Sequence, residues 1–251
     1  IGQLNVTDKN FPCKFEAALL PLVDIVDELQ QPNEALTTTI KSLINFKSNY
    51  YCVQRAIIKV MSRCSKLYRD RKEEINMIFN FLVAMLQDGR LAEEAASAFE
   101  DVCDSNTEFV VANIASFMSV LNNYKENEKI LHGIAVAVAT DEKYMVQYLP
   151  ALCQPYVQEI TQMKSVEALR IALKRLTETI GKATRDGSVS CTPIIVEVFR
   201  AVWPHIKPVI DNPVKLGTNA TGNDLTDSVH SLLERSCKFI KVCMRCLRRS
   251  F

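Results

Sequence analysis

The chain has 251 residues, 48% of them hydrophobic and 24% charged, with a formal net charge of +1. These values are ordinary for a folded protein that buries a core, and the length allows one large domain, two smaller ones or a run of repeats. No run of about 18 apolar residues occurs, so we expect no membrane span.

The nine cysteines are odd in number, which favours reduced thiols in a cytosolic or nuclear protein. The chain starts with Ile and ends inside a helical pattern, so we expect a fragment of a longer protein.

Apolar residues recur with helical spacing along almost the whole chain. No segment alternates apolar and polar residues for long, so strands are not expected. Short spacers with breakers such as Asp88-Gly89 separate the helical patterns, and the longest predicted loop is 211–223, which contains one Pro and two Gly. The pattern predicts helices over 14–29, 33–47, 51–68, 73–87, 91–104, 107–122, 126–139, 142–161, 165–183, 190–210 and 224–249.

The predicted helices repeat along the chain. A shift of residues 56–82 by 39 positions places Ala56 on Ala95 and Leu82 on Leu121, and a further shift continues the match of apolar positions more weakly. A period near 40 built from two helices is typical of HEAT-type repeats, which bury their apolar faces by stacking. We therefore predict an all-α fold, an α-solenoid of five to six helix pairs spanning 1–251 as a single domain. An irregular helical bundle is the alternative.

Residues that carry catalysis or bind metals are scattered. His132, His205 and His230 lie far apart in the sequence and form no metal-binding pattern. Cys243 and Cys246 have the spacing of a zinc-binding pair, but no second pair or matching histidine follows, so burial in a core explains them better. We therefore expect no catalytic residue, no metal and no cofactor, and a protein that is not an enzyme.

The last predicted helix carries an unusual concentration of positive charge. Without its six final basic residues the chain would have 24 basic residues against 29 acidic ones. At 100° per residue these six side chains fall within an arc of about 140°, opposite an apolar face. Ordinary solvated faces mix charges of both signs, because like charges one turn apart repel. We therefore predict a binding face for an anionic partner, formed by Arg235, Lys238, Lys241, Arg245, Arg248 and Arg249.

Several stretches resemble a known family. AASAFEDVCDSN (95–106), LHGIAVAVAT (131–140), EVFRAVWPHIKPVI (197–210) and ERSCKFIKVCMRCL (234–247) are similar, in order, to the middle of nuclear import receptors of the transportin-SR type, in the importin-β (karyopherin-β) superfamily. The resemblance covers roughly residues 50–250. It implies a receptor that carries serine/arginine-rich splicing factors and shuttles between cytoplasm and nucleus.

The resemblance also implies a role for the basic helix. In this family the corresponding helix is arginine-rich, lines the inner surface of a superhelix and contacts the phosphorylated arginine/serine segment of the cargo. It thus implies cargo binding by Arg235, Lys238, Lys241 and Arg245, two of which are lysine here. Lysine lacks the planar fork with which arginine grips phosphate. The implied partners are cargo proteins, nuclear pore proteins and, through parts outside this chain, the GTPase Ran, with no membrane and no direct nucleic acid.

Other readings of the basic helix stay open. The chain could be a helical-repeat scaffold without a role in transport, or an importin-β receptor with a different cargo, because relatives share the scaffold. A nucleic-acid-binding solenoid is a third reading. Single-stranded nucleic acid usually stacks on aromatic side chains, and only Phe239, on the apolar side, and Phe251 lie near the basic residues.

Overall fold

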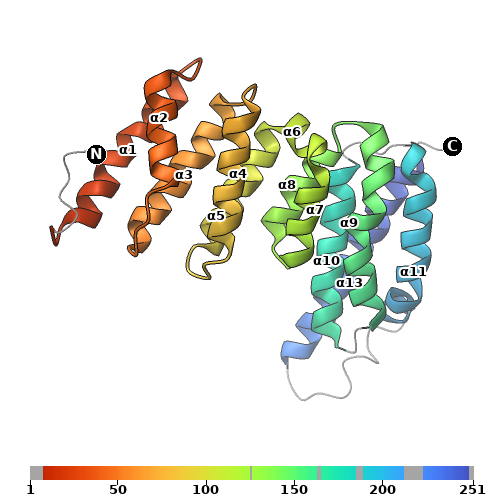
Figure 1. Cartoon of the computed structure of the whole chain (residues 1–251). Coiled ribbons are helices and arrows are strands. Elements are labelled where there is room, and N and C mark those ends of the chain that lie inside the picture. The colour runs from red at the N-terminus through yellow and green to blue at the C-terminus, as the bar shows by residue number, and fades with distance from the viewer. Residues whose placement is uncertain (1–7, 125, 163–164, 185–188, 212–222, 249–251) are drawn as a thin grey trace. The chain divides into compact units, whose positions relative to one another are not determined.

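The computed structural model describes residues 8–124, 126–162, 165–184, 189–211 and 223–248 (Figure 1). All regular structure within these residues is helical. The elements are α1 (Phe11–Glu28), α2 (Glu34–Ile44), α3 (Tyr51–Leu67), α4 (Lys72–Leu86), α5 (Ala92–Ser105), α6 (Thr107–Ala112), α7 (Ile114–Asn123), α8 (Glu128–Val138), α9 (Glu142–Gln162), α10 (Val166–Ala183), the 3-10 helix η1 (Val189–Cys191), α11 (Thr192–Asp211) and α13 (Asn223–Arg248).

Each helix predicted from the sequence is present, but the one predicted over 107–122 is divided into α6 and α7. The break lies at Asn113, whose φ of −117° and ψ of 24° are not helical. Its side-chain Nδ2 donates to the carbonyl oxygen of Phe109 at 2.9 Å, a bond that competes with the helical ladder. Residues 212–222 of the predicted loop 211–223 lie outside the described residues, and its two end residues belong to α11 and α13.

The chain divides into two compact units, residues 1–134 and 135–251, with the boundary inside α8. In the first unit α1 packs on α3 and α3 on α5, while α4 lies against both α3 and α5 (Figure 1). One aromatic cluster joins four successive helices. The ring centroid of Phe117 (α7) lies 4.4 Å from the ring centroid of Phe79 (α4), 5.4 Å from that of Phe99 (α5) and 6.0 Å from that of Phe109 (α6). Phe99 and Phe117 are positions of the predicted repeat, and both are 0% exposed.

Polar contacts also join neighbouring helix pairs in the first unit. Asn106, at the end of α5, is 3% exposed and donates from Nδ2 to the carbonyl oxygens of Ser65 at 3.2 Å and Val102 at 3.1 Å. The hydroxyl of Ser62 donates to the carboxylate of Asp101, which lies 39 residues further along the chain. This separation equals the predicted repeat, so equivalent faces of α3 and α5 are bound directly to each other.

In the second unit α9 packs on α10 and α11, and both of these helices pack on α13 (Figure 1). The core contains Leu152 and Tyr156 from α9, Leu176 from α10 and Val202 from α11, all at most 1% exposed. The Phe199 ring of α11 stacks on the Phe239 ring of α13, with 6.1 Å between the ring centroids. Each unit thus stacks helices that cannot cover their own apolar faces.

The chain is therefore an all-helical α-solenoid, as the sequence predicted. That it forms a single continuous solenoid over 1–251 stays a prediction, because each unit is described by itself. No helix among the described residues is long and apolar enough to cross a bilayer.

The close approach of α8 to α5 provides a test of this packing. A Cβ atom at Gly133 would lie 2.9 Å from Cys103 Cβ and 3.1 Å from Glu100 Cα, distances that force the helices apart. We expect Gly133→Ala to lower the free energy of unfolding by about 1–3 kcal/mol, the usual cost of overpacking. Urea unfolding of the whole chain measures the change.

The control is Gly181→Ala in α10, where no atom lies within 4 Å of the added Cβ. There the higher helix propensity of alanine should raise stability by about 0.5–1 kcal/mol. A Gly133→Ala chain as stable as the Gly181→Ala chain would contradict the described contact between α8 and α5.

Candidate functional site

The burial of one side of α13 sets the direction of all its side chains. The buried side chains follow helical spacing and are Val229, Leu232, Ser236, Phe239, Cys243 and Cys246. They face α10 and α11, on which α13 packs, and Phe239, at 0% exposed, occupies the middle of this face. Because this apolar side is fixed against its neighbours, the opposite side of the helix is left facing solvent.

Three of the predicted binding residues lie on that open side. Lys238, Lys241 and Arg245 are exposed and follow one another at intervals of one helical turn. We call these three residues the cationic row. Arg235 lies at the edge, half-buried, and its Nε is buried with no hydrogen-bond partner among the described residues. The side chain of Arg248 and the whole of Arg249 lie outside the described residues.

One cation of the row has an acidic partner. Lys238 Nζ lies 2.6 Å from Glu234 Oε1, one turn earlier on the same helix, and both side chains are about half exposed. The hydrogen bond from Lys238 holds the pKa of the Glu234 carboxyl below its usual value. Lys241 and Arg245 make no ion pair with any described residue. Within the cationic row, the positive charge without an acidic partner therefore lies at Lys241 and Arg245.

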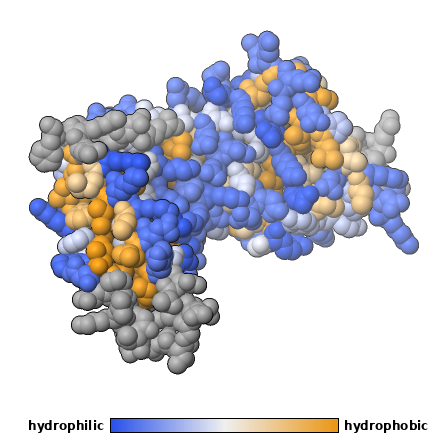
Figure 2. Space-filling model, turned by 180° about the vertical axis from the view of Figure 1, so that it is seen from behind, coloured by the Kyte–Doolittle hydropathy of each residue, from blue (hydrophilic) through white to orange (hydrophobic). Residues whose placement is uncertain are grey.

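An apolar strip runs beside the cationic row. Met244 is 54% exposed and Cys237 is also exposed, while Leu233 and Ile240 are half-buried. Figure 2 shows hydrophobic side chains gathered next to hydrophilic ones on the surface of the second unit. A partner that covers this part of α13 would therefore meet positive charge on one side and apolar surface on the other. The expectation that the row faces the concave side of a superhelix stays a prediction.

Other candidate chemistry stays dispersed in the part of the chain that the structure describes. The histidines belong to different helices, His132 to α8, His205 to α11 and His230 to α13. No described group of three or more His, Cys, Asp or Glu side chains is arranged to hold a metal ion. Cys243 and Cys246 are 1% and 2% exposed, which confirms the prediction that they fill a core.

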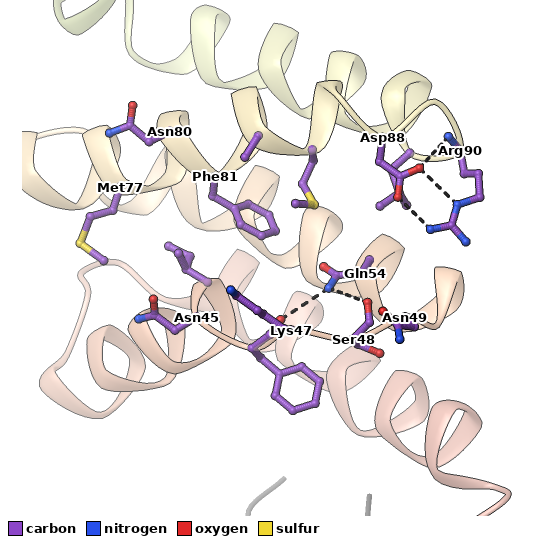
Figure 3. Close-up of a pocket in the computed structure, with 15 residues that line it drawn as sticks. Asn45, Lys47, Ser48, Asn49, Gln54, Met77, Asn80, Phe81, Asp88 and Arg90 are labelled. Atoms are coloured by element: carbon purple, nitrogen blue, oxygen red, sulfur yellow. Dashed lines mark hydrogen bonds and ion pairs between the residues drawn. The ribbon is translucent and has the colours of Figure 1, made fainter.

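The first unit contains a cleft that the sequence did not indicate. It has a volume of about 660 Å³ and lies between the α2–α3 loop, α4 and the α4–α5 turn (Figure 3). Lys47, Gln54, Asn80 and Phe81 are among the residues that line it. These residues follow no motif or common period, so no signal in the sequence connects them before the chain folds.

No family model and no curated protein matches the chain. Solved structures that resemble it include designed armadillo repeat protein YIII(Dq)4CqI, with 14% identity, 93% of this chain and 97% of that chain covered, and a TM-score of 0.47. Another is designed armadillo repeat protein YIII(Dq.V1)4CPAF in complex with peptide (KR)4, with 14% identity, 93% and 96% covered, and a TM-score of 0.48. Likenesses at this level say nothing about what the chain binds. The class that the fold defines is a helical-repeat scaffold.

Two cysteines of α13 test the orientation of the helix. Burial raises the pKa of the Cys243 thiol to about 12, whereas Cys237 is exposed on the opposite side. Because an accessible thiolate attacks alkylating reagents, iodoacetamide at mildly alkaline pH should modify Cys237 well before Cys243. Mass spectrometry of the digested chain measures both rates, and the difference should vanish in denaturant. Equal rates in the folded chain would contradict the described orientation of α13.

Proposed function

We propose that the chain is a protein-binding section of a helical-repeat receptor and that the cationic row of α13 holds acidic, phosphorylated segments of its partners. The observation that carries this proposal is the pair Lys241 and Arg245. Both are exposed, they lie one turn apart, and neither has an acidic partner among the described residues. Such an arrangement leaves repulsion that an anion relieves.

Phosphorylated serine suits this row because it adds about −1.5 to −2 charges and three acceptor oxygens. Arg245 offers the planar fork that grips phosphate oxygens, and Lys241 offers a compact charge beside it. Lys238 can join them by exchanging Glu234 for a phosphate, which carries more charge. A disordered segment that contacts several such groups gains affinity from many modest interactions.

The finer proposal is that this receptor imports phosphorylated arginine/serine-rich splicing factors into the nucleus. It rests on the sequence resemblance to the transportin-SR type of import receptor, with Arg235, Lys238, Lys241 and Arg245 in the place of that family's arginines. Under this proposal the chain shuttles between cytoplasm and nucleus and has no catalytic activity of its own. Ran and nuclear pore proteins would act on it through the full-length receptor.

The surroundings of the row favour a protein ligand over nucleic acid. Base stacking needs an exposed aromatic side chain beside the positive charge. Phe239, which follows Lys238 in the sequence, is 0% exposed and stacks on Phe199 instead. The strip of Leu233, Ile240 and Met244 offers apolar contact without an aromatic face.

The test is the binding of an arginine/serine peptide in phosphorylated and unphosphorylated form, measured by fluorescence anisotropy at two salt concentrations. We expect the phosphorylated peptide to bind more tightly and salt to weaken it, because the contacts are charged and exposed. The triple variant Lys238→Ala, Lys241→Ala and Arg245→Ala should bind the phosphorylated peptide on the order of tenfold more weakly or worse.

A matched control removes the same charge elsewhere in the second unit. Lys143, Arg200 and Lys207 are exposed on α9 and α11, and their joint change to Ala should leave the phosphopeptide affinity nearly unchanged. Equal binding of both peptides, or equal losses in the two triple variants, would overturn the proposal. Stronger binding of single-stranded RNA than of the phosphopeptide would favour the nucleic-acid reading.

A further inference from the structure

The cleft in the first unit arises because one side of the helix stack is more open than the other. α1 packs closely on α3, whereas α2 and α4 touch at few points, and the α2–α3 loop lies beside the gap. The resulting space of about 660 Å³ is lined by the end of α2, this loop, the start of α3, residues 77–85 of α4 and the α4–α5 turn (Figure 3). Its size falls within the range of ligand-binding pockets in proteins.

Two amide oxygens in the cleft are held in place by the bonds of their own nitrogens. Gln54 Nε2 donates to the carbonyl oxygens of Ser48 at 3.2 Å and Phe46 at 3.5 Å, so its Oε1 must face the other way. In Figure 3 this oxygen lies on the side of α4. Asn45 is fixed in the same manner, because its Nδ2 donates to the Lys41 carbonyl oxygen at 2.8 Å. Each oxygen is thus oriented in advance to accept a hydrogen bond.

The oxygen of Gln54 also lacks a donor. Gln54 Oε1 is buried and has no hydrogen-bond partner among the described residues. A buried acceptor without a donor is unfavourable, so an N–H group that reaches it gains more than it would at the surface. Reaching it requires side chains of the wall to move. Met77 and Met85 line the cleft, and methionine is the apolar side chain that adapts most readily.

The charge of the cleft is positive. Arg90 is neutralised by Asp88, since its Nη2 lies 2.9 Å from Asp88 Oδ2 and its backbone N–H donates to Oδ1 at 3.0 Å. Lys47 is exposed and forms no ion pair with any described residue. Lys47 lines the cleft, and in Figure 3 its side chain extends from the loop in the direction of Asn45. The free charge of the cleft is therefore one lysine, which a carboxylate would complement.

The polar groups are spread along the cleft instead of converging on one point. Figure 3 shows Asn80 and Asn45 toward one end, Gln54 in the middle and Arg90 at the other end, with the Phe81 ring between them. A compact metabolite would be held by groups that point to one centre. Amide side chains in a row instead match an extended peptide, whose backbone offers N–H and C=O groups at regular intervals.

We propose that this cleft binds a short extended peptide segment of another protein, with backbone N–H groups on Gln54 Oε1 and Asn45 Oδ1 and an acidic side chain on Lys47. The peptide's apolar side chains lie against Phe81, Met77 and Met85. The site is separate from α13 and does not depend on the function proposed for the cationic row. It gives the first unit a binding specificity of its own.

The test uses short degenerate peptides with blocked ends and one fixed central residue, which is Asp in one pool, Asn in a second and Lys in a third. The protein is the whole chain with Lys238, Lys241 and Arg245 changed to Ala, so that α13 does not capture acidic peptides. Mass spectrometry measures how much of each pool the immobilised chain retains. We expect the Asp pool to be retained on the order of fivefold more than the Asn pool.

Further substitutions in this background locate the site. Lys47→Ala should abolish the preference for the Asp pool, and Lys47→Glu should reverse it in favour of the Lys pool. Asn45→Ala should weaken retention of the Asp and Asn pools equally, because Asn45 Oδ1 accepts a backbone N–H group that both pools share. Lys59→Ala, an exposed lysine of α3 outside the cleft, is the control and should change nothing.

The Lys47→Glu variant should change the preferred pool from Asp to Lys. This result is informative even if a variant is less stable, because an unfolded chain would not gain a preference for the Lys pool. Equal retention of the Asp and Asn pools in the starting background would overturn the proposal. A preference for the Asp pool that remains in the Lys47→Ala variant would also overturn it. The same holds if Lys59→Ala removes this preference as Lys47→Ala does. None of these outcomes bears on the phosphopeptide test of the cationic row.

Discussion

The packing of α13 on α10 and α11 is the contact on which the proposed function depends. Leu232, Phe239 and Cys243 occupy a buried face, and the cations follow on the opposite side of the same helix. A rotation of one residue, 100° about the helix axis, would bring charged side chains toward the core, where unpaired charge is very costly. The hydrophobic contact therefore determines where the positive charge is displayed, although it takes no part in binding itself.

The same principle of stacking explains the cleft of the first unit. Successive helices on one side, α1, α3 and α5, approach closely, and Ser62 of α3 is hydrogen-bonded to Asp101 of α5. Gly133 likewise allows α8 to lie close to α5. On the other side α2 and α4 pack less closely, and a loop with amide and lysine side chains borders the space between them. A helical-repeat scaffold can in this way form binding surfaces both on a helix face and between helices.

The sequence predicted the helices well because helical spacing of apolar residues is a local signal that burial reinforces. It predicted the cationic arc for the same reason, and Lys238, Lys241 and Arg245 are on the open side. It missed the break at Asn113 and the pairing of Lys238 with Glu234, because both depend on the position of a single side chain. The cleft was unpredictable, since the orientation of Gln54 is set by backbone carbonyls of a loop that takes shape only in the fold.

Hydrogen exchange along α13 tests the central claim most directly, because it reports whether this segment is a stable helix held against its neighbours. In the unmodified chain, mass spectrometry should find the amides of residues 229–247 protected to a degree similar to those of α10. Changing Phe239 to Ala should speed exchange in both helices together. If the amide hydrogens of residues 229–247 exchanged at the rate of an unstructured peptide, the proposed function would be contradicted, because no packed face of α13 would then orient the cations.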